Sequence, residues 1–324
     1  MGDNIVIIDL MNLFTRHYCA NPAMNNKGEQ IGGIVGVLYA IKNLCDTLFP
    51  TAIYICWEGS GGATKKRKLF PEYKSNRKVP KLNRFYENDI PDGKENKLFQ
   101  ISSLVEIFKH LPVYQIYIAD TEGDDIIGYI SRYKFKDDTK IIVSNDKDFY
   151  QLLGENIKIF SPNKKIFITK QDAINELGIS PINFCLAKTI NGDSSDNVDG
   201  IKGAGFKTIV KCFPELTNEV EKNIKDIIVI CEEKIKDKKC LSLYKNILLE
   251  KDKLYRNWKL MNLDTNNLNA HQIKKIDHII DDFKPKTDKL NFIKKIFEKG
   301  VSNFNIEAFF FSLNCVKQAK KGED

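Results

Sequence analysis

Two patterns of apolar residues alternate along the first half of the chain. Four short runs rich in Ile, Val and Tyr are typical of buried strands: NIVII before Asp9, AIYIC before Glu58, VYQIYIA before Glu122 and KIIVS before Asp146. Apolar residues at helical spacing follow Gly33 over 35–49, and recur over 98–111 and 124–133. This alternation predicts an α/β fold up to about Gly178, with a twisted, mainly parallel sheet flanked by helices.

Beyond residue 180 the strand signals fade. Lys-rich segments with helical apolar spacing take over, for example at 218–235 and 240–249. We therefore predict an α/β core over 1–178 and a helical subdomain over 179–324. The C-terminal residues 317–324 are expected to fray.

A strongly basic insertion interrupts the alternation from about residue 65 to 97. Three prolines break it, and Phe70, Tyr73, Phe85 and Tyr86 lie among its Lys and Arg residues. Such a long insertion between a strand and a helix is more often functional than a plain connector. Aromatic stacking combined with phosphate attraction holds single-stranded nucleic acid, whereas the simpler alternative is a solvated basic loop.

Acidic residues follow each predicted strand, and two more lie in a later glycine-rich turn. The nine are Asp9, Glu58, Glu122, Asp124, Asp125, Asp146, Asp148, Asp193 and Asp196. Ligands of open parallel sheets bind beyond the carboxyl ends of the strands, so the sheet is expected to gather these carboxylates in one crevice. One acid at a strand end can be only a helix cap, but this many would repel one another unless divalent cations neutralise them. The sequence therefore predicts a metal site with oxygen ligands.

Bulk composition narrows the class of protein. The 324 residues are 42% hydrophobic, no apolar run approaches the ~20 residues that span a bilayer, and the N-terminus lacks a signal-peptide pattern. We expect a protein that is not secreted and acts in the cytoplasm, nucleoid or a viral replication site. The eight cysteines include no C-x-x-C pair, and the four histidines have no ligand spacing, which argues against a structural zinc site. The net charge of +7 suits a polyanionic partner and equally suits simple solubility.

The segment from Gly192 to Thr208 combines the last two acids with glycines at 200, 203 and 205. Glycines between two helical patterns let backbone approach a partner closely. A helix beginning near Phe206 would offer free N–H groups to a phosphate, with Lys202 and Lys207 beside it. This pattern favours sequence-independent contact with the backbone of duplex DNA.

Taken together, these motifs resemble the 5′-nuclease family, which includes flap endonucleases, bacteriophage 5′→3′ exonucleases and the 5′-nuclease domain of bacterial DNA polymerase I. The resemblance covers roughly residues 4–213 in order, through IVIIDLMNLF, YICWEG, RKLFPEYKSNRK, TEGDD, SNDKDF and GDSSDNVDGIKGAGFKT. It implies a PIN-like α/β fold in which all nine acids lie at metal-binding positions.

The resemblance also implies roles for basic residues. Tyr73, Lys74 and Arg77 match a segment that contacts the scissile region at the base of a helical arch, here the insertion near 65–97. The region near 184–213 matches a helix-three-turn-helix that grips duplex DNA and often binds K⁺ through backbone carbonyls. The DNA contacts expected on this basis are Arg67, Lys81, Arg84, Gly200, Lys202, Gly203, Gly205, Lys207 and Thr208.

The implied activity is hydrolysis of phosphodiesters at a 5′ end or flap, leaving a 5′-phosphate and a 3′-hydroxyl. Two Mg²⁺ ions, replaceable by Mn²⁺, would activate water and stabilise the attacking and leaving oxygens. We assign Glu58, Glu122, Asp124 and Asp146 to the tighter ion, with Asp9 acting through water. Asp125, Asp148, Asp193 and Asp196 are assigned to the second ion, and Lys74 and Arg77 would offset charge on the scissile phosphate.

Two positions depart from the family pattern. Glu58 stands where the family usually has Asp, and its longer side chain would shift one metal or act through water. Gly123 replaces the usual alanine, which lowers helix propensity.

The same residues are also compatible with two alternative functions. One is a catalytically silent DNA-binding replication protein on the same fold, although a binder gains nothing from nine acids facing a polyanion. Another is an enzyme whose main substrate is RNA in an RNA–DNA hybrid, as in primer removal. For the nuclease we expect a monomer acting on branched, flapped or nicked duplexes in replication or repair, with replication proteins as possible partners.

Overall fold

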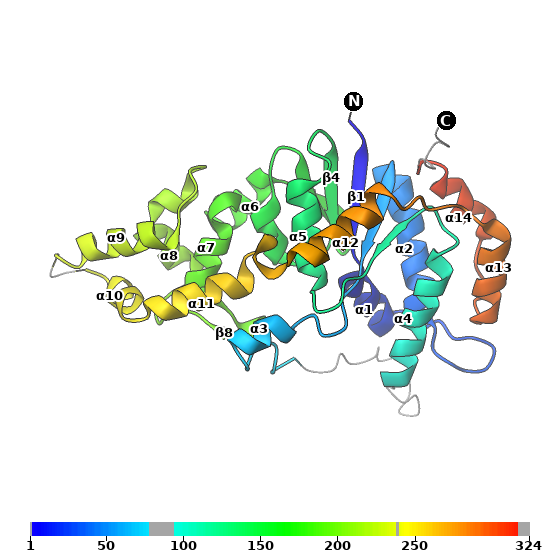
Figure 1. The fold of residues 1–324 in the computed structure, drawn as a ribbon, viewed down its shortest axis with the longest axis horizontal. Coiled ribbons are helices and arrows are strands. Elements are labelled where there is room, and N and C mark those ends of the chain that lie inside the picture. The colour runs from blue at the N-terminus through cyan, green and yellow to red at the C-terminus, as the bar shows by residue number, and fades with distance from the viewer. Residues whose placement is uncertain (1, 78–93, 238–239, 317–324) are drawn as a thin grey trace.

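A six-stranded sheet forms the centre of the computed structural model, which describes residues 2–77, 94–237 and 240–316 (Figure 1). Its strands are β1 (Asn4–Asp9), β2 (Ala52–Cys56), β3 (Tyr114–Ile116), β4 (Thr139–Val143), β5 (Ile157–Ser161) and β6 (Ile166–Ile168). They lie in the order β3-β2-β1-β4-β5-β6, and all neighbours are parallel except β5 and β6. The mainly parallel sheet predicted from the sequence is confirmed.

Both faces of the sheet are covered, which explains why β1 is apolar at consecutive positions. Ile5 and Ile7 belong to one hydrophobic cluster, whereas Val6 and Ile8 belong to another. The Val6 cluster includes residues of α1 (Leu10–Ala20), α2 (Gly32–Leu48), α4 (Lys94–Phe108), α13 (Lys289–Glu298) and α14 (Ile306–Leu313). The Ile5 cluster includes residues of α5 (Gly123–Tyr133), η1 (Lys147–Leu152), α6 (Lys170–Leu177), α7 (Pro181–Asn191) and α12 (Ala270–Asp281).

The chain beyond residue 178 is helical apart from the short hairpin β7 (Gly192–Asp193) and β8 (Val198–Asp199) within the described residues. Its other elements are η2 (Ser194–Asp196), α8 (Phe206–Cys212), η3 (Pro214–Thr217), α9 (Ile224–Lys234), α10 (Ser242–Leu249), α11 (Lys251–Met261) and η4 (Thr265–Asn267). Figure 1 shows α9 and α10 at one end of the molecule and α13 and α14 at the other. Because α13 and α14 pack on α2 and α4, part of the C-terminal half belongs to the core cluster, and the division at residue 178 stays a prediction.

Two elements differ from the sequence expectation. The strand expected over 113–119 is only three residues long. The backbone just beyond it lies close to Gly59, where a Cβ would be 1.9 Å from the carbonyl oxygen of Ile118. The helix expected from residue 98 begins at Lys94, and α3 (Thr64–Leu69) forms at the other end of the basic insertion. Residues 78–93 of the insertion and the tail 317–324 lie outside the described residues.

None of the described helices combines the length and the apolar composition that crossing a bilayer requires.

Candidate metal centre

The carboxyl ends of β1 and β4 meet at Asp9. One carboxylate oxygen, Oδ1, accepts a hydrogen bond from the backbone N–H of Asn12 (3.1 Å) and so caps α1. The other, Oδ2, accepts from the hydroxyl of Ser144, directly after β4 (2.9 Å). Asp9 therefore caps α1 and also links the end of β1 to the end of β4 through a hydrogen bond.

Asp124 and Asp146 lie in the same electrostatic environment as Asp9. Burial raises the pKa of Asp124 well above its usual value, and the negative charges of Asp9 and Asp146 raise it further. Burial and the neighbouring Asp148 raise the pKa of Asp146 to about 6. Carboxylates that disfavour each other's ionisation in this way are well suited to a divalent cation.

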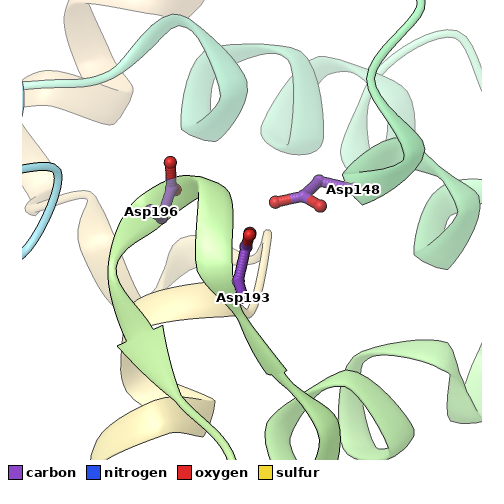
Figure 2. Close-up of side chains that lie close together, drawn as sticks. All are labelled: Asp148, Asp193 and Asp196. Atoms are coloured by element: carbon purple, nitrogen blue, oxygen red, sulfur yellow. The ribbon is translucent and has the colours of Figure 1, made fainter. Parts of the chain in front are cut away.

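Asp148, Asp193 and Asp196 form a second group, from η1 and from the β7–η2 turn (Figure 2). One carboxylate oxygen from each lies within 4.8 Å of the others. Figure 2 shows the three side chains facing a common space between these elements. Carboxylate oxygens are the ligands that hard divalent cations such as Mg²⁺ prefer, so the donor set fits such an ion.

Lys188 neutralises part of this second group. Its ammonium contacts Oδ1 of Asp148 and lies 2.7 Å from Oδ2 of Asp193. Burial opposes its positive charge, but these two carboxylates outweigh burial and raise the pKa of Lys188. Lys188 therefore supplies a positive charge shared by Asp148 of η1 and Asp193 of the hairpin.

Glu122 is fully buried and is held by cations. The ammonium of Lys66 contacts Oε2, and that of Lys74 lies 2.5 Å from Oε1. Burial alone would raise the pKa of Glu122, but Lys66 and Lys74 together lower it to about 2. Glu122 is therefore ionised throughout the physiological range.

Asp125 and Glu58 are not members of the group formed by Asp148, Asp193 and Asp196. Asp125 is 2% exposed and faces Lys66 (3.4 Å to Nζ) and the side-chain amide of Asn267 (3.0 Å). Its contacts give no support to the second-metal role expected from the sequence. Glu58 is exposed at the end of β2, and its Oε2 accepts from the backbone N–H of Gly123 (3.2 Å).

The segment from Tyr73 to Arg77 joins the acid groups. The Tyr73 hydroxyl lies 3.2 Å from Oε2 of Glu122 and 3.1 Å from Oδ2 of Asp196. Arg77 pairs with Oδ1 of Asp196 (2.6 Å), and the backbone N–H of Lys74 donates to the Asp196 carbonyl (2.8 Å). Lys74 has a φ of +57°, an uncommon conformation for a residue with a side chain, which these contacts hold in place.

The residues expected to contact DNA fall into three sets. Lys202 and Lys207 are exposed beside α8, which begins at Phe206 as predicted, and Thr208 is half-buried. A Cβ on Gly203 or Gly205 would meet nothing within 4 Å, whereas one on Gly200 would lie 2.1 Å from the carbonyl oxygen of Asn191. Gly200 is therefore required by packing inside the chain.

The third set lies in the basic insertion. Arg67 donates a hydrogen bond to the Tyr73 carbonyl (3.3 Å). Lys81 and Arg84, the other two residues expected to contact DNA, lie outside the described residues.

Sequence reasoning missed Lys66 and Lys188. Lys66 is one of four consecutive basic residues, and nothing in that run marks it as the buried one. For Lys188 a signal exists, since it is a single charge within the apolar stretch FCLAKTI, five residues before Asp193. A lone lysine in an apolar helix beside an acid motif is a candidate for a buried pair.

The raised pKa values predict how pH affects the metal-free protein. Because the folded state holds a proton on Asp146 up to about pH 6 while the unfolded chain releases it near 3.8, stability falls as pH rises between these values. The shift corresponds to about 3 kcal/mol. We expect urea denaturation in EDTA to show that the stability of the wild type relative to Asp146→Asn is lower at pH 7 than at pH 5, since the variant lacks this titrating carboxyl. A stability difference between the two proteins that stays the same at both pH values would contradict the burial of this carboxylate.

Comparisons with known proteins point in one direction. The family described as 5′-3′ exonuclease, N-terminal resolvase-like domain, matches residues 4–178. A 5′-3′ exonuclease of Buchnera aphidicola subsp. Acyrthosiphon pisum is 32% identical over 216 residues, which cover 66% of this chain and 71% of that protein. Flap endonuclease Xni of Shewanella pealeana is 30% identical over 212 residues, covering 64% and 75%.

A solved structure shares the fold. The D15 protein of T5, co-crystallised with metal ions, superposes with a TM-score of 0.68 at 21% identity, over 86% of this chain and 98% of that one. The bacteriophage T5 D15 flap endonuclease has also been solved in a complex with DNA and metal ions, with a TM-score of 0.62 at 18% identity, over 96% and 99%.

Proposed function

Since this chain belongs to the 5′-3′ exonuclease family, we propose that it is a divalent-metal-dependent 5′ nuclease that binds DNA and hydrolyses its phosphodiester bonds. One observation carries the proposal: Asp148, Asp193 and Asp196 each bring a carboxylate oxygen within 4.8 Å of the others, and the segment from Tyr73 to Arg77 connects this group to the buried Glu122. A silent binding protein would gain nothing from such a costly concentration of buried charge.

Mg²⁺ is the ion that this proposal favours, with Mn²⁺ able to replace it. We place one ion near Asp9, Asp124 and Asp146, with Glu58 and Glu122 beside it, and the second near Asp148, Asp193 and Asp196. When bound, such a pair activates a water and stabilises both the attacking and the leaving oxygen of an in-line displacement.

The cationic side chains hold the phosphodiester. Lys74 lies 2.5 Å from Glu122 and 3.8 Å from Asp196, so it stands between the two acid groups. Arg77 is half-exposed and can reach a phosphate while remaining near Asp196. We propose that both offset negative charge developing on the scissile phosphate, which is a larger effect in a site that excludes water.

DNA on either side of the scissile bond is assigned to two regions. The helix-three-turn-helix near 184–213, with exposed Lys202 and Lys207, would hold duplex, and the basic insertion would hold the 5′ single strand. A K⁺ ion there would share two carbonyls of this segment with side-chain donors. The Gly200 carbonyl accepts from Lys253 (3.2 Å), and the Lys202 carbonyl accepts from Asn246 (2.8 Å).

Cleavage of a 5′-labelled flap duplex, with Mg²⁺ and with EDTA, tests the proposal. We expect a product with a 3′-hydroxyl in Mg²⁺ and none in EDTA. A parallel substrate with an RNA 5′ strand on DNA separates a DNA enzyme from one directed at primers. Failure to cut any flapped or nicked duplex in Mg²⁺ or Mn²⁺ would leave only a binding role.

Lys74→Ala is expected to lower the cleavage rate at saturating DNA by about a hundredfold, because one cation facing the developing phosphate charge contributes a few kcal/mol. The affinity for DNA should change far less, since backbone contact is proposed to be shared with other residues such as Lys202 and Lys207. Single-turnover kinetics over a range of enzyme concentrations separates the two constants. A loss confined to affinity would make Lys74 a docking residue only, and Lys207→Ala is the matched control for that outcome.

A further inference from the structure

Two adjacent residues of α11 lie behind the candidate metal centre, outside the stretch that the family match covers. The Asn257 side chain is fully buried, and its Nδ2 donates to the carbonyls of Thr189 (3.2 Å) and Asp199 (2.8 Å). These carbonyls stand at the two ends of the segment 190–198, which carries Asp193 and Asp196. A single amide therefore holds both ends of this acid-bearing segment.

Arg256 links this amide to the base of the basic insertion. Its Nε and Nη2 lie 3.2 and 2.9 Å from Oδ1 of Asn257, and its guanidinium carbon lies 4.2 Å from the centroid of the Phe70 ring. The Phe70 carbonyl in turn accepts from the backbone N–H of Tyr73 (3.0 Å). A planar guanidinium can stack on a ring and hydrogen-bond at its edge simultaneously, as here.

The same two segments also meet directly at the front of the site, where Tyr73, Lys74 and Arg77 contact Asp196. Tyr73 packs in one small cluster with Leu260 and Met261 of α11. The segments 70–77 and 190–199 are thus joined through Asp196 on one side and through Arg256 and Asn257 on the other.

We propose that Arg256 and Asn257 are a positioning pair that sets where Asp193 and Asp196 stand relative to Lys74 and Arg77, and thereby sets the affinity of the second metal position. The inference rests on the proposed function, since it concerns the same acids. Groups that orient metal ligands in this way typically change metal affinity by about 10–100-fold when removed.

The test must separate positioning from plain stability, because removal of any buried amide that is hydrogen-bonded weakens a fold. Asn183 provides the matched control. It is equally buried and lies on α7, but its amide donates to the carbonyls of Asn218 (3.1 Å) and Val220 (3.0 Å), away from the acids. Asn257→Ala and Asn183→Ala should lose comparable stability, while only the first should disturb the hairpin.

Mn²⁺ binding to the full-length protein, followed by the electron paramagnetic resonance signal of free Mn²⁺, is the direct readout. We expect Asn257→Ala to raise the weaker of two Kd values about tenfold and to leave the tighter one unchanged. Arg256→Lys keeps the charge but loses the planar group, so it should give a smaller shift of the same sign. Asn183→Ala should bind Mn²⁺ as the wild type does.

Amide hydrogen exchange of residues 190–199 in EDTA gives a second readout that needs no metal, and it should be faster in Asn257→Ala than in Asn183→Ala. If Asn257→Ala leaves both the Kd values for Mn²⁺ and the exchange rates unchanged, the inference is overturned. Equal shifts of these quantities in Asn257→Ala and Asn183→Ala would overturn it as well. A wild-type protein that binds no Mn²⁺ would instead overturn the proposed function, and the exchange comparison would still decide whether Asn257 positions the hairpin.

Discussion

Asp148→Asn is expected to reduce flap cleavage at saturating Mg²⁺ on the order of 10²- to 10³-fold, because a bound ion contributes several kcal/mol of charge stabilisation in the transition state. Asp148 belongs to the group whose oxygens lie within 4.8 Å of one another, so loss of one anionic ligand weakens the whole position. DNA binding should persist or improve slightly, since a negative charge facing a polyanion has been removed.

Single-turnover cleavage and fluorescence anisotropy in EDTA measure the two effects separately. Asp137→Asn is the matched control, because Asp137 is an exposed aspartate in the turn before β4 and is expected to behave as the wild type. Retention of more than about a tenth of the wild-type rate by Asp148→Asn would remove this carboxylate from the metal centre.

The second large effect is expected for Lys66→Met, which replaces a buried ammonium with an apolar side chain of similar length. Lys66 is 5% exposed and contacts both Glu122 and Asp125. Among the described residues, its removal leaves Asp125 without a cationic partner and Glu122 with Lys74 alone. Breaking a buried pair from one side typically costs about 3–5 kcal/mol. Urea denaturation should show a loss of this size in the free energy of unfolding.

Two further variants make the result interpretable. Lys147→Met breaks an ion pair with Glu176 in which both side chains are exposed, and it should cost less than about 1 kcal/mol. Asp125→Asn added to Lys66→Met removes one unpaired charge and should restore part of the stability. A cost for Lys66→Met as small as that for Lys147→Met would mean that the acids are not held by this lysine.

The sheet and the places of the acids could be predicted from the sequence, because strands buried on both faces leave continuous apolar runs. Asp9 and Asp146 follow such runs, and parallel pairing brings the ends of these strands to one edge. The i, i+3 spacing of Glu122 and Asp125 correctly predicted a shared side, since both contact Lys66.

The partners of these acids could not be predicted in the same way. Lys66 and Glu122 are 56 positions apart, and no local pattern indicates that the basic helix α3 packs its lysine against the acid at the start of α5. Likewise, helical spacing in α13 and α14 shows which face is apolar, but not that Phe292 and Phe309 pack with the core of the first half. The role of Asn257 is of the same kind, because a buried amide is recognised only through the carbonyls it contacts.

Binding of a pair of divalent ions by the carboxylates is the central step of the proposed function. Anomalous diffraction from Mn²⁺-soaked crystals of the wild-type protein measures it directly. We predict two peaks about 3.5–4 Å apart. One should lie beside Asp124 and Asp146, and the other beside Asp148, Asp193 and Asp196. A single peak elsewhere would contradict binding of two ions by these acids. So would the absence of any peak at these acids with Lys188 still paired to Asp148 and Asp193.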